Sequence, residues 1–170
     1  MKRIQLTKGY STIVDDEDYD MLSGYNWIAD DYHLPYVKVV TYINRKKITM
    51  ARLIMGVTDR EIFIDHIDCD PLNNQMNNLR LATPEENARN CKKSTLRKHT
   101  SQYKGVVWHK RQKKFRATIH IKDKTIHLGE YNTEEEAAIR YNKAAKEYFG
   151  EFAYLNQVGR GSQLFALSYT

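Results

Sequence analysis

Residues 62–90 restrict the fold most, because two short apolar segments and a helix start follow one another closely there. Residues 62–64 predict a strand that ends in two polar residues, and residues 79–82 alternate as a second strand. Asp-Pro and Asn-Asn dipeptides between them indicate a loop. Thr83 and Glu86 form a capping box with proline at the first helical position. The segment therefore predicts strand, loop, strand and helix in that order.

The polar residues of this segment have the spacing of a catalytic site. Asp65 and His66 end the first strand, and Asn78 and Asn87 follow 12 and 21 residues after the histidine. A histidine with an ordinary pKa of ~6.5 accepts a proton near neutral pH. Carboxylate and amide oxygens are ligands that suit Mg²⁺ and Mn²⁺. This arrangement predicts a small metal-dependent nuclease centre.

Residues 1–61 predict a mixed lead-in with no evident chemistry. Short apolar alternation suits strands, a run of acidic residues suits a helix start, and a polar turn between alternating segments indicates a hairpin. The expected elements are a strand at 11–14, a helix that starts at residues 15–18, a hairpin of 36–42 and 47–50 around the turn at 44–46, and a short helix at 51–57.

The basic residues are concentrated in one segment. Residues 89–127 contain 13 of the 27 Lys and Arg residues and one acid, Asp123, for a net charge of +12; the rest of the chain carries −6. Tyr103, Trp108 and Phe115 are interleaved with these cations. Such a block is the expected footprint of phosphate-backbone binding, and the alternative is a solvated basic face.

Residues 103–156 predict a second small domain of three strands and one helix. A capping box at Thr133 starts the helix and Gly150 ends it, and its Ala-Tyr stripe is expected in a core. The strands are expected at residues 105–108, 114–121 and 125–131. Residues 91–102 lack apolar periodicity and are interpreted as a basic linker that orders on nucleic acid, and residues 157–170 as a loose tail.

Length and composition narrow the class of protein. The 170 residues suffice for one medium or two small domains, and 41% hydrophobic content supports a packed core. The sequence contains no apolar run close to the ~20 residues that a membrane span requires. The first residues do not have the pattern of a signal peptide. Cys69 and Cys91 are expected to be plain thiols. We therefore expect a cytoplasmic protein.

Residues 65–74 read Asp-His-Ile-Asp-x-Asp-Pro-Leu-Asn-Asn, and residues 77–83 read Asn-Asn-Leu-Arg-Leu-Ala-Thr. This pattern resembles the HNH family of homing-type endonucleases, whose site is a ββα-metal fold, and the lead-in is similar to that of phage-type members. The resemblance implies that His66 is the general base. It also implies that Asp65 and Asn87 hold one divalent cation, Mg²⁺ or Mn²⁺.

The same resemblance places Asn78 in the catalytic set as the residue that fixes the loop through side-chain hydrogen bonds to the backbone. Two positions depart from the family pattern. Ala51 stands where members often have histidine, and Cys69 stands where they commonly have glycine. A side chain at the second position is expected to strain the turn. Because of these two departures, an impaired or engineered enzyme remains an alternative.

Residues 103–156 resemble the DNA-binding domain of plant ethylene-response (APETALA-two) factors, in Leu128-Gly129-Glu130-Tyr131 and in the alanine-rich helix. The resemblance implies a three-stranded sheet in the major groove with a helix behind it, but not the plant base preference, since Val107, Arg111 and His127 replace family residues. Trp108 and Phe115 are expected in the core. Charge and resemblance together give as expected DNA contacts Arg80 (alternatively a plain surface residue), Lys92, Lys93, Arg97, Lys98, Lys104, His109, Lys110, Arg111, Lys114, Arg116, Thr118, His120, Thr125 and His127.

The sequence thus predicts an α+β protein with an HNH nuclease domain at 1–90 (lead-in 1–61, ββα-metal core 62–90), a linker at 91–102, a DNA-binding domain at 103–156 and a tail. The expected function is metal-dependent cleavage of double-stranded DNA, with homing implied by resemblance alone. The expected setting is a monomer without an obligate protein partner, in a bacterial or phage-infected cell. A sequence-specific DNA-binding regulator with an inactive nuclease module is the alternative, and an RNA-binding role a weaker one.

Overall fold

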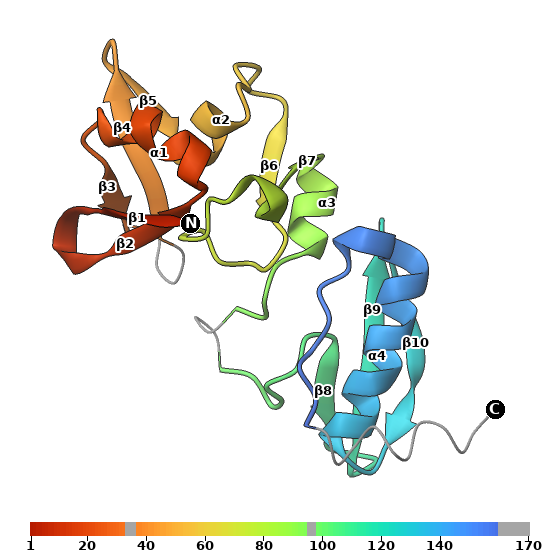
Figure 1. Cartoon of the computed structure of the whole chain (residues 1–170). Coiled ribbons are helices and arrows are strands. Elements are labelled where there is room, and N and C mark those ends of the chain that lie inside the picture. Colours follow the sequence, from red (N-terminus) through yellow and green to blue (C-terminus); the bar gives the residue numbers. More distant parts are fainter. Residues whose placement is uncertain (33–36, 95–97, 160–170) are drawn as a thin grey trace. The chain divides into compact units, whose positions relative to one another are not determined.

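The computed structural model describes residues 1–32, 37–94 and 98–159. The chain divides into two compact units, Met1–Asn90 and Cys91–Thr170 (Figure 1). Unit 1 combines helices with small antiparallel sheets, and the described part of unit 2 combines helices with one antiparallel sheet. The fold is therefore mixed α and β. Within the described part of the chain, no helix is long and apolar enough to cross a membrane.

The first half of unit 1 consists of two small sheets and two short helices. Each sheet is antiparallel, and the three-stranded one has the order β3-β4-β5. The elements are β1 (Lys2–Gln5), η1 (Thr7–Gly9), β2 (Ser11–Val14), α1 (Asp16–Ser23), β3 (Ile28–Asp30), β4 (Lys38–Ile43), β5 (Lys46–Thr49) and α2 (Met50–Ile54). The strand at 11–14 is confirmed, and the expected hairpin is present as β4 and β5, except that Val37 precedes β4 and Met50 begins α2; Tyr36 lies outside the described residues.

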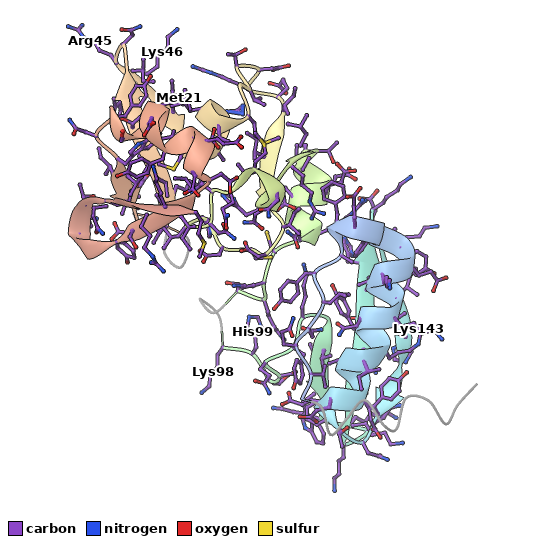
Figure 2. The ribbon with its side chains drawn as sticks, in the orientation of Figure 1. Met21, Arg45, Lys46, Lys98, His99 and Lys143 are labelled. Atoms are coloured by element: carbon purple, nitrogen blue, oxygen red, sulfur yellow. The ribbon has the colours of Figure 1, made fainter. Side chains whose placement is uncertain are left out.

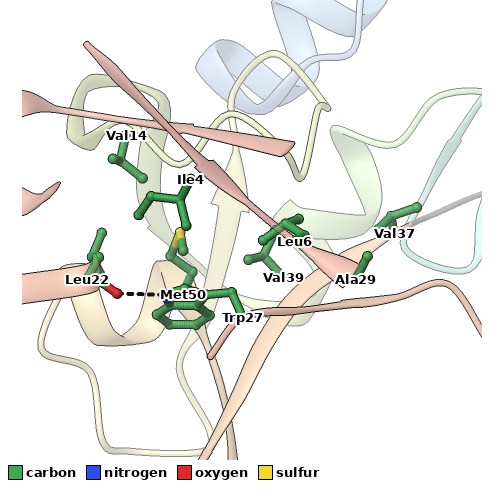
Figure 3. Close-up of a cluster of buried hydrophobic side chains, with 9 residues drawn as sticks. All are labelled: Ile4, Leu6, Val14, Leu22, Trp27, Ala29, Val37, Val39 and Met50. Carbon is green, nitrogen blue, oxygen red and sulfur yellow. Dashed lines mark hydrogen bonds between the residues drawn. The ribbon is translucent and has the colours of Figure 1, made fainter. Parts of the chain in front are cut away.

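A cluster of buried side chains joins these elements (Figure 3). Leu22 of α1 and Met50 of α2 are fully buried, and Trp27 is 3% exposed. The indole Nε1 of Trp27 donates to the carbonyl of Leu22 at 2.8 Å, so the ring is buried without leaving its polar atom unpaired. At the far end of the β4–β5 hairpin, Arg45 and Lys46 point outwards (Figure 2).

The second half of unit 1 has the strand–loop–strand–helix order that the sequence predicts. β6 (Phe63–His66) pairs with β7 (Leu79–Ala82), η2 (Met76–Asn78) precedes β7, and α3 (Pro84–Arg89) follows it. The Thr83 capping box is formed in both directions, and α3 packs against both strands. Asp65 lies opposite Arg80 in the ladder, so these two side chains share one face of the hairpin.

The loop between β6 and β7 is attached to β2. The N–H of Ile13 donates to the carbonyl of Leu72 at 2.8 Å, and the N–H of Asn74 donates to the carbonyl of Ile13 at 2.8 Å. Ile13 and Asn73 form an isolated parallel bridge. The lead-in thereby fixes the course of the loop that follows His66.

Unit 2 is a three-stranded antiparallel sheet with one long helix against it. The order is β10-β9-β8, formed by β8 (Val106–His109), β9 (Lys114–Ile121) and β10 (Lys124–Tyr131), and α4 (Glu134–Phe149) contacts all three strands; η3 (Gly150–Phe152) follows. The expected alanine and tyrosine core of the helix is confirmed: Ala137, Ala138, Tyr141, Ala144 and Ala145 are all buried. The rings of Trp108 and Phe115 pack edge to face, with their centroids 4.8 Å apart.

The segment interpreted as a linker is attached to unit 2. Its described residues, 91–94 and 98–102, include neither helix nor strand. The ammonium of Lys93 donates to the carbonyls of Ser101 (2.9 Å), Tyr103 (2.8 Å) and Val106 (3.0 Å), which engages all three of its hydrogens. Residues 95–97 and residues 160–170 of the expected tail lie outside the described residues.

Candidate active site

The imidazole of His66 is held by a buried asparagine. Nε2 of His66 lies 3.3 Å from Oδ1 of Asn74, which is 1% exposed. The amide nitrogen of Asn74 donates to Oγ1 of Thr12 and to the carbonyl of Pro71, both at 3.0 Å, so its oxygen is the acceptor that faces His66. Nε2 of a neutral His66 therefore carries the hydrogen, and Nδ1 carries the lone pair.

A residue of the lead-in, Thr12, anchors Asn74. Thr12, in β2, is fully buried and donates its hydroxyl hydrogen to the carbonyl of Leu72 at 2.8 Å, so its oxygen accepts from Asn74. The sequence interpretation assigned Asn74 to a turn and gave the lead-in no chemistry. Thr12 follows Ser11 in a short strand, and nothing in the sequence distinguished the two polar residues.

Burial sets the protonation of His66. Desolvation of the partly buried ring lowers its pKa from the ordinary value, and this outweighs the opposing effects of the Asn74 hydrogen bond and of the carboxylates of Asp68, Asp65 and Asp70. A lowered pKa keeps the imidazole neutral at neutral pH. A neutral ring with its lone pair on Nδ1 is the form that accepts a proton.

Asp65 is buried beside His66 with its charge compensated. Nε and Nη2 of Arg80 donate to its Oδ2 at 2.9 and 2.6 Å. The amide of Asn90 donates to Oδ1 at 3.1 Å, to Oδ2 at 2.9 Å and to the carbonyl of His66 at 2.9 Å. Asn90 is 5% exposed and joins the end of α3 to β6, a role that the sequence did not reveal.

Asp65 in β6 and Asn87 in α3 are the two residues that the sequence resemblance implies as metal ligands. Among the described residues there is no group of three or more His, Cys, Asp or Glu side chains placed to hold a metal. Both carboxylate oxygens of Asp65 accept hydrogen bonds, Oδ1 from Asn90 and Oδ2 from Asn90 and Arg80, and Asn87 lies partly buried on α3, the helix packed against β6. Carboxylate and amide oxygens are ligands of the kind that Mg²⁺ and Mn²⁺ accept, whereas structural zinc is bound by sulfur and nitrogen ligands.

Asn78 ties the loop together. Its Oδ1 accepts from the N–H of Asp68 at 3.0 Å, and its Nδ2 donates to Oδ1 of Asp68 at 2.9 Å and to the carbonyl of Asn73 at 2.8 Å. Partial burial raises the pKa of Asp68, but hydrogen bonds from Asn73, the N–H of Asp70 and Asn78 outweigh it and lower the pKa overall. The loop is therefore closed by an ionised carboxylate.

The outer face of the sheet in unit 2 is polar and basic. Val106, Ala117 and Ile119 are buried and alternate along β8 and β9 with residues that point away from α4. The side chains that share this outer face are Val107, His109, Lys114, Arg116, Thr118, His120, Thr125, His127 and Glu130.

Comparisons with known proteins agree with both units. Residues 48–89 match the HNH endonuclease family, and residues 101–151 match the AP2 domain. An uncharacterised HNH endonuclease of Acanthamoeba polyphaga mimivirus is 32% identical over 151 residues, which cover 89% of this chain and 77% of that protein. Protein 3.8 of Escherichia phage T7 is 35% identical over 109 residues, 64% of this chain and 88% of that protein.

The chain belongs to the HNH endonuclease family. It also carries an AP2 domain. The two departures from the HNH pattern lie in different surroundings: Ala51 is buried in α2, whereas Cys69 is partly buried in the site loop with a φ of 57°. This is the left-handed region that favours glycine, so the expectation of a strained turn has a conformational basis. Sγ of Cys69 lies 2.6 Å from the carbonyl oxygen of Asn90.

The residues expected to contact DNA differ in their surroundings in the structure. The ammonium of Lys93 is engaged by three carbonyls, Lys104 donates to the carbonyl of Cys91 at 2.8 Å, and Arg80 is bonded to Asp65. Figure 2 labels Lys98, which is exposed on the segment that precedes β8. The other exposed members are Lys92, Lys110, Arg111, Lys114, His120, Thr125 and His127; His109, Arg116 and Thr118 are partly buried, and Arg97 lies outside the described residues.

Proposed function

We propose that this protein is a metal-dependent, homing-type HNH endonuclease that hydrolyses phosphodiester bonds in double-stranded DNA. Its site would be a ββα-metal arrangement of β6, β7 and α3, with His66 as the general base and with Asp65 and Asn87 as ligands of one Mg²⁺ or Mn²⁺ ion. The observation that carries the proposal is the buried amide of Asn74, which presents a neutral His66 with its lone pair on Nδ1.

The chemistry follows from that geometry. Nδ1 of His66 takes a proton from a water molecule as the water oxygen attacks phosphorus, and the 3′ oxygen leaves on the opposite side. Asn74 keeps the ring oriented through the hydrogen bond at Nε2, and Asn78 holds the loop. A cation held by Asp65 and Asn87 would supply positive charge to offset the negative charge that develops on the phosphate and the leaving oxygen.

The second unit would provide affinity and position on the DNA. We assign residues 1–90 to the nuclease, 91–102 to a basic connection, 103–156 to the DNA-binding domain and 157–170 to a tail. Phosphate contacts from the basic segment position the protein, and side chains on the outer sheet face contact bases. The expected assembly is a monomer on duplex DNA without a further protein partner.

A second candidate is a DNA-binding regulator whose nuclease unit is inactive. The observation in its favour is Cys69, a side chain in the left-handed region within the loop that positions the site. This candidate predicts sequence-specific binding without any cleavage in the presence of Mg²⁺ or Mn²⁺.

A plasmid assay separates the two. Supercoiled plasmid is incubated with the protein in Mg²⁺ or Mn²⁺ and in EDTA, in parallel with His66→Ala. We expect metal-dependent nicking or linearisation that falls roughly 10²–10⁴-fold in the variant, since a general base contributes about that factor. DNA affinity and thermal unfolding of the variant serve as controls and should be unchanged. Undiminished cutting by His66→Ala would contradict the assigned base.

A further inference from the structure

Glu130 is an acid on the basic face of the AP2 domain. Between residues 91 and 131 the sequence contains two acids, Asp123 in the exposed turn after β9 and Glu130 near the end of β10. A carboxylate on a phosphate-binding face weakens attraction to DNA. The position of Glu130 on this face therefore needs an explanation other than attraction to phosphate.

A β-bulge brings Glu130 onto that face. His127 pairs with Thr118, but Gly129 pairs with Ala117, so Leu128 is the additional residue in β10. Without this shift of register, Glu130 would stand opposite Phe115 on the face covered by α4. The bulge turns it to the outer face, directly opposite Arg116.

Glu130 and Arg116 interact through one edge of the guanidinium. Nε and Nη2 of Arg116 donate to Oε1 of Glu130 at 3.0 and 2.8 Å. Nδ1 of His109 lies 3.6 Å from the same oxygen. The side chain of Glu130 is 15% exposed and that of Arg116 is 34% exposed, so the arginine is the more accessible partner.

The geometry points to a base-reading pair. We propose that Glu130 is a positioning residue that holds Arg116 so that its Nη1–Nη2 edge contacts O6 and N7 of one guanine in the major groove. A fixed guanidinium matches these two acceptors, and this is the commonest specific contact between an arginine and a base. The inference rests on the proposed DNA-binding role of this sheet.

The test uses the full chain in EDTA, so that DNA is bound without being cut. A preferred duplex is selected from a random library, and its affinity is compared with that of duplexes changed at one base pair each. We expect one G·C pair at which the wild type discriminates roughly ten-fold or more. Arg116→Lys retains the positive charge but lacks the two parallel N–H donors of the guanidinium. It should therefore lose the preference for G·C at that base pair alone.

Glu130→Gln should weaken the preference at the same pair while tightening binding to unrelated DNA, because one negative charge is removed. The double variant should discriminate no less than Arg116→Lys alone, since both changes act on one contact. Asp123→Asn is the matched control: it removes the other acid, and the preference at every base pair should persist. Melting temperatures of all variants accompany the affinities, because a purely structural salt bridge would alter stability and leave base preference unchanged.

The outcomes are distinct. Specific binding whose base preferences are unaltered by Arg116→Lys overturns the inference and leaves the DNA-binding role intact. If Glu130→Gln does not fold, Arg116→Lys decides the matter, because it preserves the ion pair. Absence of duplex binding by the wild type would instead overturn the proposed role of the sheet itself.

Discussion

At the scale of single residues, Asn74 is the side chain on which the proposed base depends. It orients His66 through Oδ1 and is itself anchored by Thr12 and Pro71. Asn74→Ala should lower the single-turnover rate of DNA cleavage by roughly ten- to a hundred-fold, comparable with the loss of other orienting partners. The decrease should be smaller than that caused by His66→Ala, because the base itself remains.

Asn77→Ala provides the control, since Asn77 lies in the same loop and is exposed. It should cleave like the wild type. DNA affinity should be equal in both variants, because Asn74 is 1% exposed and unable to contact DNA directly. A cleavage rate unaffected by Asn74→Ala would show that the ring is positioned by other contacts.

The close placement of Asp65 and His66 could be predicted because both belong to one short run of sequence. Asn74 and Asn90 could not be assigned, because their roles arise from contacts between distant residues. Asn74 contacts Thr12 across 62 positions, and Asn90 reaches Asp65 across 25. Asparagine is common in turns, so its type alone does not distinguish a loop residue from a buried anchor.

At the scale of elements, local signals predicted β6, β7, α3 and α4 well. Capping boxes at Thr83 and Thr133 start both helices as expected. β1 and β3 were not predicted, because each has a single buried residue, Ile4 and Ala29 respectively, and therefore no clear alternation. The outward position of Glu130 was also unpredictable, since it depends on a bulge in β10.

Gly105 is an element-scale constraint on unit 2. Its φ is 75°, and a Cβ there would lie 2.0 Å from Cδ2 of Tyr141 and 2.8 Å from the carbonyl oxygen of Thr118. Gly105→Ala should therefore disrupt the packing of α4 on the sheet. Gly150 is the matched control, because its φ is 56° but no atom lies within 4 Å of an added Cβ.

Both substitutions place an alanine at a positive φ, and only Gly105→Ala adds a collision with neighbouring atoms. We expect Gly105→Ala to lower the free energy of unfolding by about 1–3 kcal/mol more than Gly150→Ala, the usual range for overpacking a core. Urea unfolding of the two variants measures this difference. Equal stabilities would mean that Tyr141 moves aside freely.

At the scale of the whole molecule, the candidate catalytic residues and most of the basic residues belong to different units. The candidate catalytic residues His66 and Asp65 lie in Met1–Asn90, whereas the dense basic segment lies almost wholly in Cys91–Thr170. The sequence analysis placed the HNH-like motif at residues 62–90 and the basic block at residues 89–127. Because Lys93 is bonded to carbonyls of unit 2, a cut directly after Asn90 separates the units more cleanly than one after residue 102.

Removal of residues 91–170 should therefore weaken DNA binding and flatten its dependence on salt, while metal-dependent cleavage at high protein concentration persists. Each phosphate contact that is lost reduces the slope of log K against log salt by ~0.9. Fluorescence anisotropy at several salt concentrations gives the slope, and circular dichroism establishes that the remaining unit is folded. If a folded Met1–Asn90 retained the full salt slope, the basic segment would not be the phosphate-binding surface, and the outer face of the sheet would lose its proposed role.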